Sequence, residues 1–126
     1  MSMCWIVCTS LIDVYPSLVD LANLEIPSWL DGESINLQIN DPSKPRSPAI
    51  SSYGNANTSI RTNHWRYIRY EDGSEELYDH RNDPNEWFNL ANKSDFLKIK
   101  NKLINMIPED QYPGLKVQKW FDNFQK

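Results

Sequence analysis

The strongest constraint on the fold is a pair of segments that alternate in side-chain character around an Asp-Gly turn. The first segment, HWRYIRYE (residues 64–71), is predicted to be a strand with Trp65, Tyr67 and Arg69 on one face and Arg66, Ile68 and Tyr70 on the other. The Asp-Gly pair in EDGS (71–74) favours a tight hairpin turn, so EELYD (75–79) is expected to return as the paired strand. The sequence therefore predicts an antiparallel hairpin.

Further strands and a helix extend this hairpin. AISSY (49–53) and TSIRT (58–62) are short strand candidates, which gives an antiparallel sheet of three to four strands. A helix is predicted over residues 93–107, because apolar side chains recur at helical spacing at Phe96, Ile99, Leu103 and Ile107, with Leu97 and Ile104 beside them. The short apolar tail at Trp120, Phe121 and Phe124 is expected to dock on another surface, which the sequence does not identify.

An N-terminal helix is predicted over residues 10–24 from a second apolar pattern. Ser10 is a candidate cap with Asp13 at the third helical position, and Pro16 predicts a kink or a later helix start. DPSKPRSP (41–48) holds three prolines and is expected to be an exposed connector. The predicted fold class is α+β: an antiparallel sheet with a C-terminal helix packed on it, preceded by an N-terminal helix.

Charge and cysteine usage exclude some classes of function. The net charge is −4 with acids and bases mixed, whereas nucleic-acid binding needs a basic footprint. The apolar start is too short to span a bilayer and lacks the lead-in and cleavage site of a signal peptide, so neither membrane nor localisation is indicated. An apolar start of this kind suggests that the chain begins inside a domain. Cys4 and Cys8 make a poor zinc signature and are either buried thiols or a local disulfide.

The run EELYDHRNDPNEWFNLA (75–91) concentrates acids in a way that suggests a metal or acid/base site. Its spacing favours a structural interpretation, because Asp83 is a preferred helix cap, Pro84 suits the first helical position and Glu86 can complete a capping box. Trp87, Phe88 and Leu90 would form the packing face of that helical turn. A calcium loop would need a central glycine, which this run lacks. His80 is predicted to be a surface residue.

Two blocks of the sequence resemble the C-terminal part of the sulfatases of the alkaline phosphatase superfamily. They are SLIDVYPSLVDLANLEIP followed by LDGES, and SIRTNHWRYIRYEDGSEELYDHRNDPNEWFNLA, and together they span about Ser10 to Ala91. The iduronate-sulfatase-like and bacterial branch is the most similar in style. The resemblance implies that residues 1–48 end the large sulfatase domain, as a helix and a Pro-rich connector, and that residues 49–126 form its C-terminal subdomain.

The family hydrolyses sulfate esters with a formylglycine made from a Cys/Ser-x-Pro/Ala-x-Arg motif, beside a calcium held by Asp and Asn. Neither Cys4 nor Cys8 has Pro or Ala at the second place or Arg at the fourth. No catalytic residue and no metal ligand is therefore assigned. Calcium and formylglycine are expected only in a full-length relative, and such relatives are often periplasmic, secreted or lysosomal.

Two residues are candidates for contact with a substrate. In relatives the segment before SIRT often contains Gly-Asn-x-His and can face the substrate cleft, and here it reads GNANTSIRT (54–62). The resemblance makes Asn57 and Arg61 substrate-side candidates. The alternative is that Asn57 makes a turn and Arg61 pairs on the sheet.

The predicted function is that of a C-terminal sulfatase fragment, which is structural, shapes the substrate cleft and is inactive alone. Its expected partner is the missing catalytic domain, or a second copy through an orphaned apolar face. The alternative is a non-enzymatic module that binds sulfated carbohydrate or complements a sulfatase in trans. For that alternative, Trp65, Tyr67 and Arg69 would stack on a sugar; otherwise these aromatic residues cover the helix.

Overall fold

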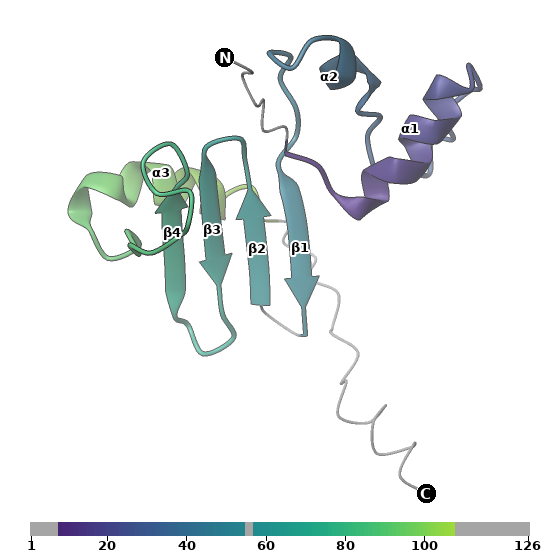
Figure 1. Cartoon of the computed structure of the whole chain (residues 1–126). Coiled ribbons are helices and arrows are strands. Elements are labelled where there is room, and N and C mark those ends of the chain that lie inside the picture. Colours follow the sequence, from purple (N-terminus) through teal and green to yellow (C-terminus); the bar gives the residue numbers. More distant parts are fainter. Residues whose placement is uncertain (1–7, 55–56, 108–126) are drawn as a thin grey trace, which may run out of the picture. The chain divides into compact units, whose positions relative to one another are not determined.

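The computed structural model describes residues 8–54 and 57–107 (Figure 1). The chain divides into two compact units, Met1–Ala49 and Ile50–Lys126. Cys4 and the tail with Trp120, Phe121 and Phe124 lie outside the described residues, whereas Cys8 is buried. None of the helices in the described part has the length and apolar character needed to cross a bilayer.

The first unit contains a short 3-10 turn (η1, Leu11–Asp13), α1 (Val14–Leu21) and α2 (Asn36–Asn40). The predicted cap forms, because the Ser10 N–H donates to the Asp13 carboxylate over 2.7 Å. The α-helix begins only at Val14, which puts Pro16 in its first turn. The missing N–H of proline costs nothing there, because the first helical N–H groups have no partner inside the helix. The expected later start is confirmed.

A buried ion pair closes this unit. Arg46 Nη2 lies 2.6 Å from Asp13 Oδ2, and its side chain is only 4% exposed. Asp13 also accepts the N–H of Glu33 over 3.0 Å, and Arg46 donates to the carbonyl oxygens of Glu33 and Ser34. Burial acts to raise the pKa of Asp13, but these bonds and the guanidinium outweigh it and lower the pKa. The prediction of an exposed connector is therefore wrong at Arg46.

The second unit is built on a four-stranded sheet in the order β1-β2-β3-β4. Its strands are β1 (Ala49–Tyr53), β2 (Asn57–Arg61), β3 (Trp65–Arg69) and β4 (Glu75–Asp79). The sheet is antiparallel, with Ile60 opposite Tyr67 and Tyr67 opposite Leu77. Gly73, at φ +83°, makes the tight turn that the Asp-Gly signal predicted. The predicted α+β fold class is confirmed.

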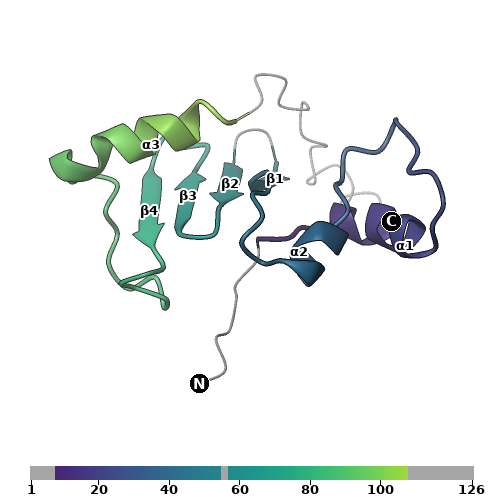
Figure 2. The same cartoon turned by 90° about the horizontal axis from the view of Figure 1, so that it is seen from above.

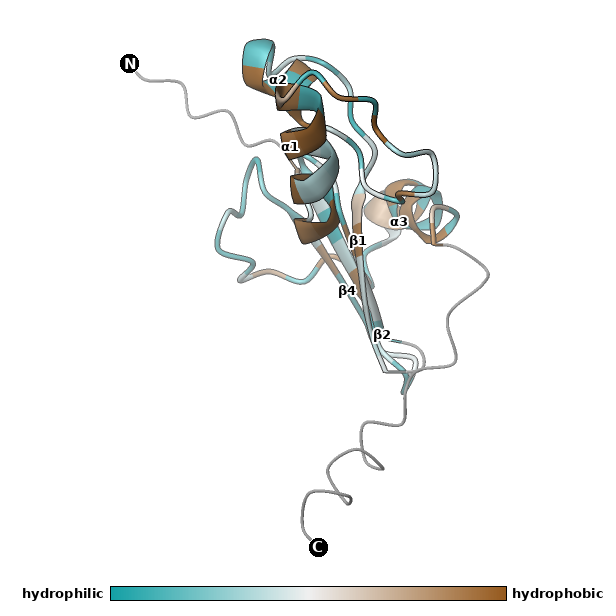
Figure 3. Cartoon of the chain, turned by 90° about the vertical axis from the view of Figure 1, so that its right-hand side faces the viewer, coloured by the Kyte–Doolittle hydropathy of each residue, from teal (hydrophilic) through white to brown (hydrophobic). Residues whose placement is uncertain are grey.

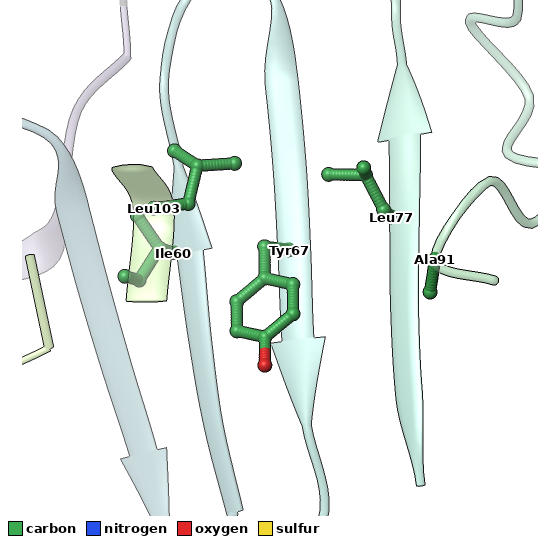
Figure 4. Close-up of a cluster of buried hydrophobic side chains, with 5 residues drawn as sticks. All are labelled: Ile60, Tyr67, Leu77, Ala91 and Leu103. Atoms are coloured by element: carbon green, nitrogen blue, oxygen red, sulfur yellow. The ribbon is translucent and has the colours of Figure 1, made fainter. Parts of the chain in front are cut away.

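A helix covers one face of this sheet. It comprises a 3-10 turn (η2, Ser94–Phe96) and α3 (Leu97–Ile104), and it ends earlier than predicted. The buried core joins sheet, loop and helix through Ile60, Tyr67, Leu77, Ala91 and Leu103 (Figure 4). Partly buried Phe96, Ile99, Ile104 and Ile107 pack against it, as the apolar stripe predicts, whereas Leu97 is exposed.

Polar contacts fix α3 and the edge of β4. Glu75 accepts the Tyr67 hydroxyl and lies 2.7 Å from Lys100 Nζ, so one carboxylate links the sheet to the helix. The Asn89 side chain accepts the Leu77 N–H and donates to the Glu75 carbonyl, and the Leu90 N–H donates to the Leu77 carbonyl. These bonds occupy backbone groups that an edge strand would otherwise expose to other chains.

We expect Arg46→Gln to lower the free energy of unfolding by about 3 kcal/mol, because it leaves the Asp13 carboxylate buried without its cation. Lys44→Gln is the matched control: Lys44 pairs with Asp41 over 3.6 Å in the same connector, but both side chains are about half exposed. Loss of that pair should cost less than about 1 kcal/mol. Urea denaturation of both variants measures the difference, and equal losses would contradict the account.

Candidate functional site

A cluster of charged side chains lies at the end of the sheet where β2 and β4 finish and β3 begins. The strand register places Arg61 of β2 directly opposite Arg66 of β3, and Arg66 opposite Tyr78 of β4. Along each strand these residues alternate with the core residues Ile60, Tyr67 and Leu77, so they belong to the face of the sheet away from the core. Two like charges opposite each other in a sheet are destabilising unless a counter-charge joins them.

Glu86 supplies that counter-charge from the loop after β4. Its carboxylate lies 2.9 Å from Arg66 Nη1, 3.6 Å from Arg61 Nη1 and 2.6 Å from His80 Nε2. We call Arg61, Arg66, His80 and Glu86 the charged cluster. Burial acts to raise the pKa of Glu86, but the bonds to His80 and Arg66 outweigh it and keep the pKa below its ordinary value. The carboxylate is therefore ionised at neutral pH.

His80 is an inner member of the cluster and not the surface residue predicted from the sequence. Its side chain is 5% exposed, and the short distance to Glu86 indicates that Nε2 carries a proton and donates it. Its buried Nδ1 has no hydrogen-bond partner within the described part of the chain.

The predicted capped helix at Asp83 does not form, although the Asp83 carboxylate does bind backbone N–H groups. It accepts the N–H of Trp87 over 3.1 Å and of Phe88 over 2.8 Å, which stabilises a non-helical loop. Glu86 has a positive φ of 59°, and its carboxylate binds Arg66 and His80, whereas the Asp83 N–H donates to the Asp79 carbonyl. Trp87 and Phe88 are 74% and 66% exposed, so the expected packing face is also wrong, except at Leu90, which packs on the core.

The position of this loop is visible in Figure 2. The helix α3 crosses one side of the sheet, and the segment that follows β4 swings to the opposite side before it returns to α3. The loop that contains Asp83 to Phe88 therefore lies on the side of the sheet that α3 leaves open. The charged cluster ties this loop to β2 and β3.

The structure separates the two substrate-side candidates. Asn57 begins β2 and Arg61 ends it, so their Cα atoms lie about 13 Å apart along the strand. The Asn57 amide donates to the Tyr53 carbonyl over 3.0 Å and accepts the Glu71 N–H over 3.1 Å, which joins two turns. Arg61 lies in the charged cluster. Sequence reasoning missed its neighbours Arg66, His80 and Glu86, although cross-strand pairing of two arginines was a signal that could have been used.

The aromatic strand face that the binding-module hypothesis used is occupied. Tyr67 is fully buried in the core, and Trp65 contacts Phe96 edge-on with ring centroids 5.9 Å apart. The Arg81 guanidinium lies 5.2 Å from the centre of the Trp65 ring and is held there by Asp79 at 2.8 Å. These aromatic residues pack beneath the helix, which is the alternative that the sequence analysis left open.

The acids of the 75–91 run are engaged with protein groups. Asp79 pairs with Arg81, Asp83 binds backbone N–H groups and Glu86 binds the charged cluster. Over residues 8–54 and 57–107 no three His, Cys, Asp or Glu side chains come together in a way that could hold a metal ion. Calcium stays an expectation for a full-length relative.

Comparison with known proteins gives a consistent result. A family model described as "N-sulphoglucosamine sulphohydrolase, C-terminal" matches residues 7–112. A sulfatase from Formosa agariphila is 38% identical over 95 residues, which cover 74% of this chain and 18% of that protein. Human arylsulfatase K is 32% identical over 100 residues, which cover 67% of this chain and 19% of that protein. The chain thus spans about a fifth of the length of these relatives.

Solved structures are also similar to this chain. A crystal structure of a putative sulfatase from Bacteroides thetaiotaomicron matches with a TM-score of 0.61 and 28% identity, over 75% of this chain and 22% of that one. A protein solved in complex with its substrate D-glucosamine-2-N,6-O-disulfate matches with a TM-score of 0.61 and 27% identity, again over 75% and 22%.

We expect Glu86→Gln to lower the free energy of unfolding by about 2 kcal/mol at pH 7, because it removes a charge-assisted set of hydrogen bonds. The folded pKa of Glu86 lies below its ordinary value of 4.5. Its contribution is therefore complete above about pH 4.5 and fades as the pH falls through the folded value. Denaturation of both proteins from pH 7 to pH 3 should show the difference shrinking.

The exposed turn residue Glu71 provides the control, and Glu71→Gln should change stability little at any of these pH values. A loss in Glu86→Gln that stays constant down to pH 3 would show that the ionised carboxylate is not what holds the cluster.

Proposed function

The chain belongs to the family of N-sulphoglucosamine sulphohydrolase C-terminal domains, and we propose that it acts as the structural C-terminal part of a sulfatase, together with a catalytic region. In this proposal it shapes the substrate cleft and has no turnover of its own. No Cys or Ser in the 126 residues begins the Cys/Ser-x-Pro/Ala-x-Arg pattern. The curated relatives are about five times longer than the matched segment, which supports a catalytic region as the partner.

The observation that carries the proposal is the orientation of α1. Its buried side chains are small or polar: Pro16 and Ser17 are buried, as is Asp13 before them. The Ser17 hydroxyl donates to the Asp13 carbonyl and accepts the Ile35 N–H, so the helix packs on its own unit through polar contacts. Its large apolar side chains are left outside, which is the reverse of an ordinary amphipathic helix in a soluble protein.

We call these outward side chains the α1 face; it consists of Leu11, Ile12, Val14, Tyr15, Leu18, Leu21 and the nearby Trp29, all more than half exposed. Figure 3 shows hydrophobic residues along α1. Ile12, Tyr15, Trp29 and Leu30 line an open hollow of about 510 Å³ beside the helix. The loop approaches the helix so closely at Gly32 that a Cβ there would lie 2.1 Å from the Ile12 carbonyl oxygen.

An exposed apolar surface of this extent is typical of an interface. We assign it to the catalytic region of a sulfatase, because about four-fifths of each relative's length lies outside the matched segment. Burial of a single leucine side chain is worth about 2 kcal/mol, so a face of seven apolar residues gives a strong driving force for docking. Self-association through the same face is the competing outcome.

The proposal includes two predictions from the sequence, on the branch of the family and on the division of the chain. Membership of the iduronate-sulfatase-like branch stays a prediction, as does the assignment of residues 1–48 to the large domain and residues 49–126 to the subdomain. The glycan-binding alternative gains no support at Trp65 and Tyr67, because the core and Phe96 occupy that face.

We predict that the purified chain does not hydrolyse an aryl sulfate. It should restore hydrolysis when co-expressed with the Formosa agariphila sulfatase from which the matching 95 residues have been deleted. Leu18→Asp, at the centre of the α1 face and 60% exposed, should weaken this rescue at least tenfold, because it places a charge in the interface.

Leu97→Asp is the matched control, because Leu97 is 47% exposed on α3 in the other unit. The Leu97→Asp variant should restore hydrolysis as well as the unaltered chain does. Turnover by the chain alone would contradict the absence of catalysis. Sedimentation showing a dimer that Leu18→Asp dissociates, with no rescue by either form, would assign the α1 face to a second copy instead.

A further inference from the structure

We infer that the hollow beside α1 binds a guanidinium group, and that an arginine of the sulfatase catalytic region supplies it. We call this site the α1 hollow; it is lined by Ile12, Tyr15, Trp29, Leu30, Asp31 and Gly32. The inference rests on the proposed function, which makes the α1 face an interface with that region. The affinity of the hollow for a guanidinium compound is nevertheless a property of the chain by itself and is tested without a partner.

The α1 hollow is held in shape by contacts within the first unit. The Asp13 carboxylate accepts the N–H of Glu33 over 3.0 Å, and the Ser17 hydroxyl accepts the N–H of Ile35 over 3.1 Å. These bonds fix the chain against η1 and α1 directly after the lining residues 29–32. A site that is formed before its ligand arrives loses less conformational freedom when the ligand binds.

Two aromatic residues and one acid line the α1 hollow together. Tyr15 and Trp29 are 54% and 75% exposed, so a ligand can reach both side chains. Asp31 is the one charged residue among the described residues that line the hollow. Its carboxylate has no hydrogen bond or ion pair within residues 8–54 and 57–107. An aromatic face and a carboxylate both attract a cation, so these three residues favour the same kind of ligand.

Neither base of the first unit pairs with Asp31. Residues 1–49 contain six Asp or Glu and two Lys or Arg, so this unit has a net charge of −4, which equals that of the whole chain. Both bases are engaged elsewhere: Arg46 lies 2.6 Å from Asp13, and Lys44 lies 3.6 Å from Asp41. A counter-charge for Asp31 must therefore come from outside this unit.

Docking of the α1 face makes that counter-charge necessary. When a catalytic region covers the face, water leaves the hollow and the carboxylate of Asp31 loses part of its hydration. A carboxylate that leaves water without a partner destabilises the complex. An apolar side chain alone would fill the hollow but leave Asp31 unpaired. The partner is therefore expected to bring a cation to this place.

Arginine fits the hollow better than lysine does. Its aliphatic stem can lie against the apolar lining residues Ile12 and Leu30. Its planar guanidinium can stack on an aromatic ring and pair with a carboxylate through two parallel N–H bonds. The ammonium of lysine is a point charge that water hydrates more strongly, so its removal from water costs more. The expected order of affinity is arginine, then lysine, then leucine.

The first test is a titration of the whole isotope-labelled chain followed by NMR, with N-acetyl-arginine methylamide as the probe. We expect the indole N–H signal of Trp29 to shift, and added salt to weaken binding because the contact is ionic. Asp31→Asn should lower the affinity at least fivefold. Glu25→Gln is the matched control, because Glu25 is an exposed acid of the same unit that does not line the hollow.

The aromatic part of the hollow is tested in the same titration. Trp29→Leu keeps an apolar side chain but removes the ring, so it should also lower the affinity for the arginine compound. Trp87→Leu is its control, because Trp87 is 74% exposed in the other unit and should leave the affinity unchanged. The lysine and leucine counterparts of the probe should bind more weakly than the arginine compound.

The second test asks whether the catalytic region supplies the guanidinium. It uses co-expression with the Formosa agariphila sulfatase from which the matching 95 residues have been deleted. Asp31→Asn should lower the restored rate of hydrolysis at least fivefold, whereas Glu25→Gln should restore it as well as the unaltered chain does.

Several results would overturn the inference. Equal affinity for the arginine and leucine compounds would make the hollow an ordinary apolar pocket, and equal affinity for the lysine compound would remove the assignment to arginine. Rescue by Asp31→Asn as strong as that by the unaltered chain would overturn the inference and leave the proposed function standing. Failure of rescue by the unaltered chain, with intact binding of the arginine compound, would contradict the proposed function and leave the guanidinium site standing.

Discussion

Arg61 and Arg66 face each other on neighbouring strands, and their mutual repulsion is the constraint on which the open end of the sheet depends. Glu86 supplies the counter-charge from a loop that is distant in sequence, and its carboxylate also accepts a hydrogen bond from His80 Nε2–H. Glu86 adopts a left-handed backbone conformation, which brings its carboxylate to the arginines. Trp87 and Phe88, the two residues that follow Glu86, are 74% and 66% exposed.

The two units differ in how far their apolar side chains are buried. In the second unit, α3 closes one face of the sheet through Leu103 and through the link from Tyr67 to Glu75 to Lys100. In the first unit, the ion pair of Asp13 and Arg46 fixes a helix whose apolar residues remain outside. A part that is ordered by polar contacts and apolar on its outer surface is suited to assembly with a larger domain.

Local sequence patterns predicted the elements, whereas long-range contacts decided the details. The alternation around Trp65 to Arg69 and the turn at Gly73 predicted the hairpin correctly, since both signals act between neighbouring residues. The helix predicted at Asp83 was wrong because the Glu86 carboxylate binds Arg61 on β2, Arg66 on β3 and His80 just after β4, and these contacts outweigh one local capping bond. The burial of Arg46 was missed for the same reason, because its partner Asp13 is 33 positions away and the prolines around it suggested exposure. The substrate-side candidate Arg61 falls in the charged cluster, but Asn57 lies at the other end of β2.

The central claim is that the α1 face is a docking surface for a sulfatase catalytic region. Hydrogen–deuterium exchange tests it most directly, when the chain is compared alone and in complex with the truncated Formosa agariphila sulfatase. The account predicts that exchange slows over residues 11–24, where the exposed apolar side chains of α1 would become buried. Unchanged exchange over these residues in a complex that has formed would contradict it.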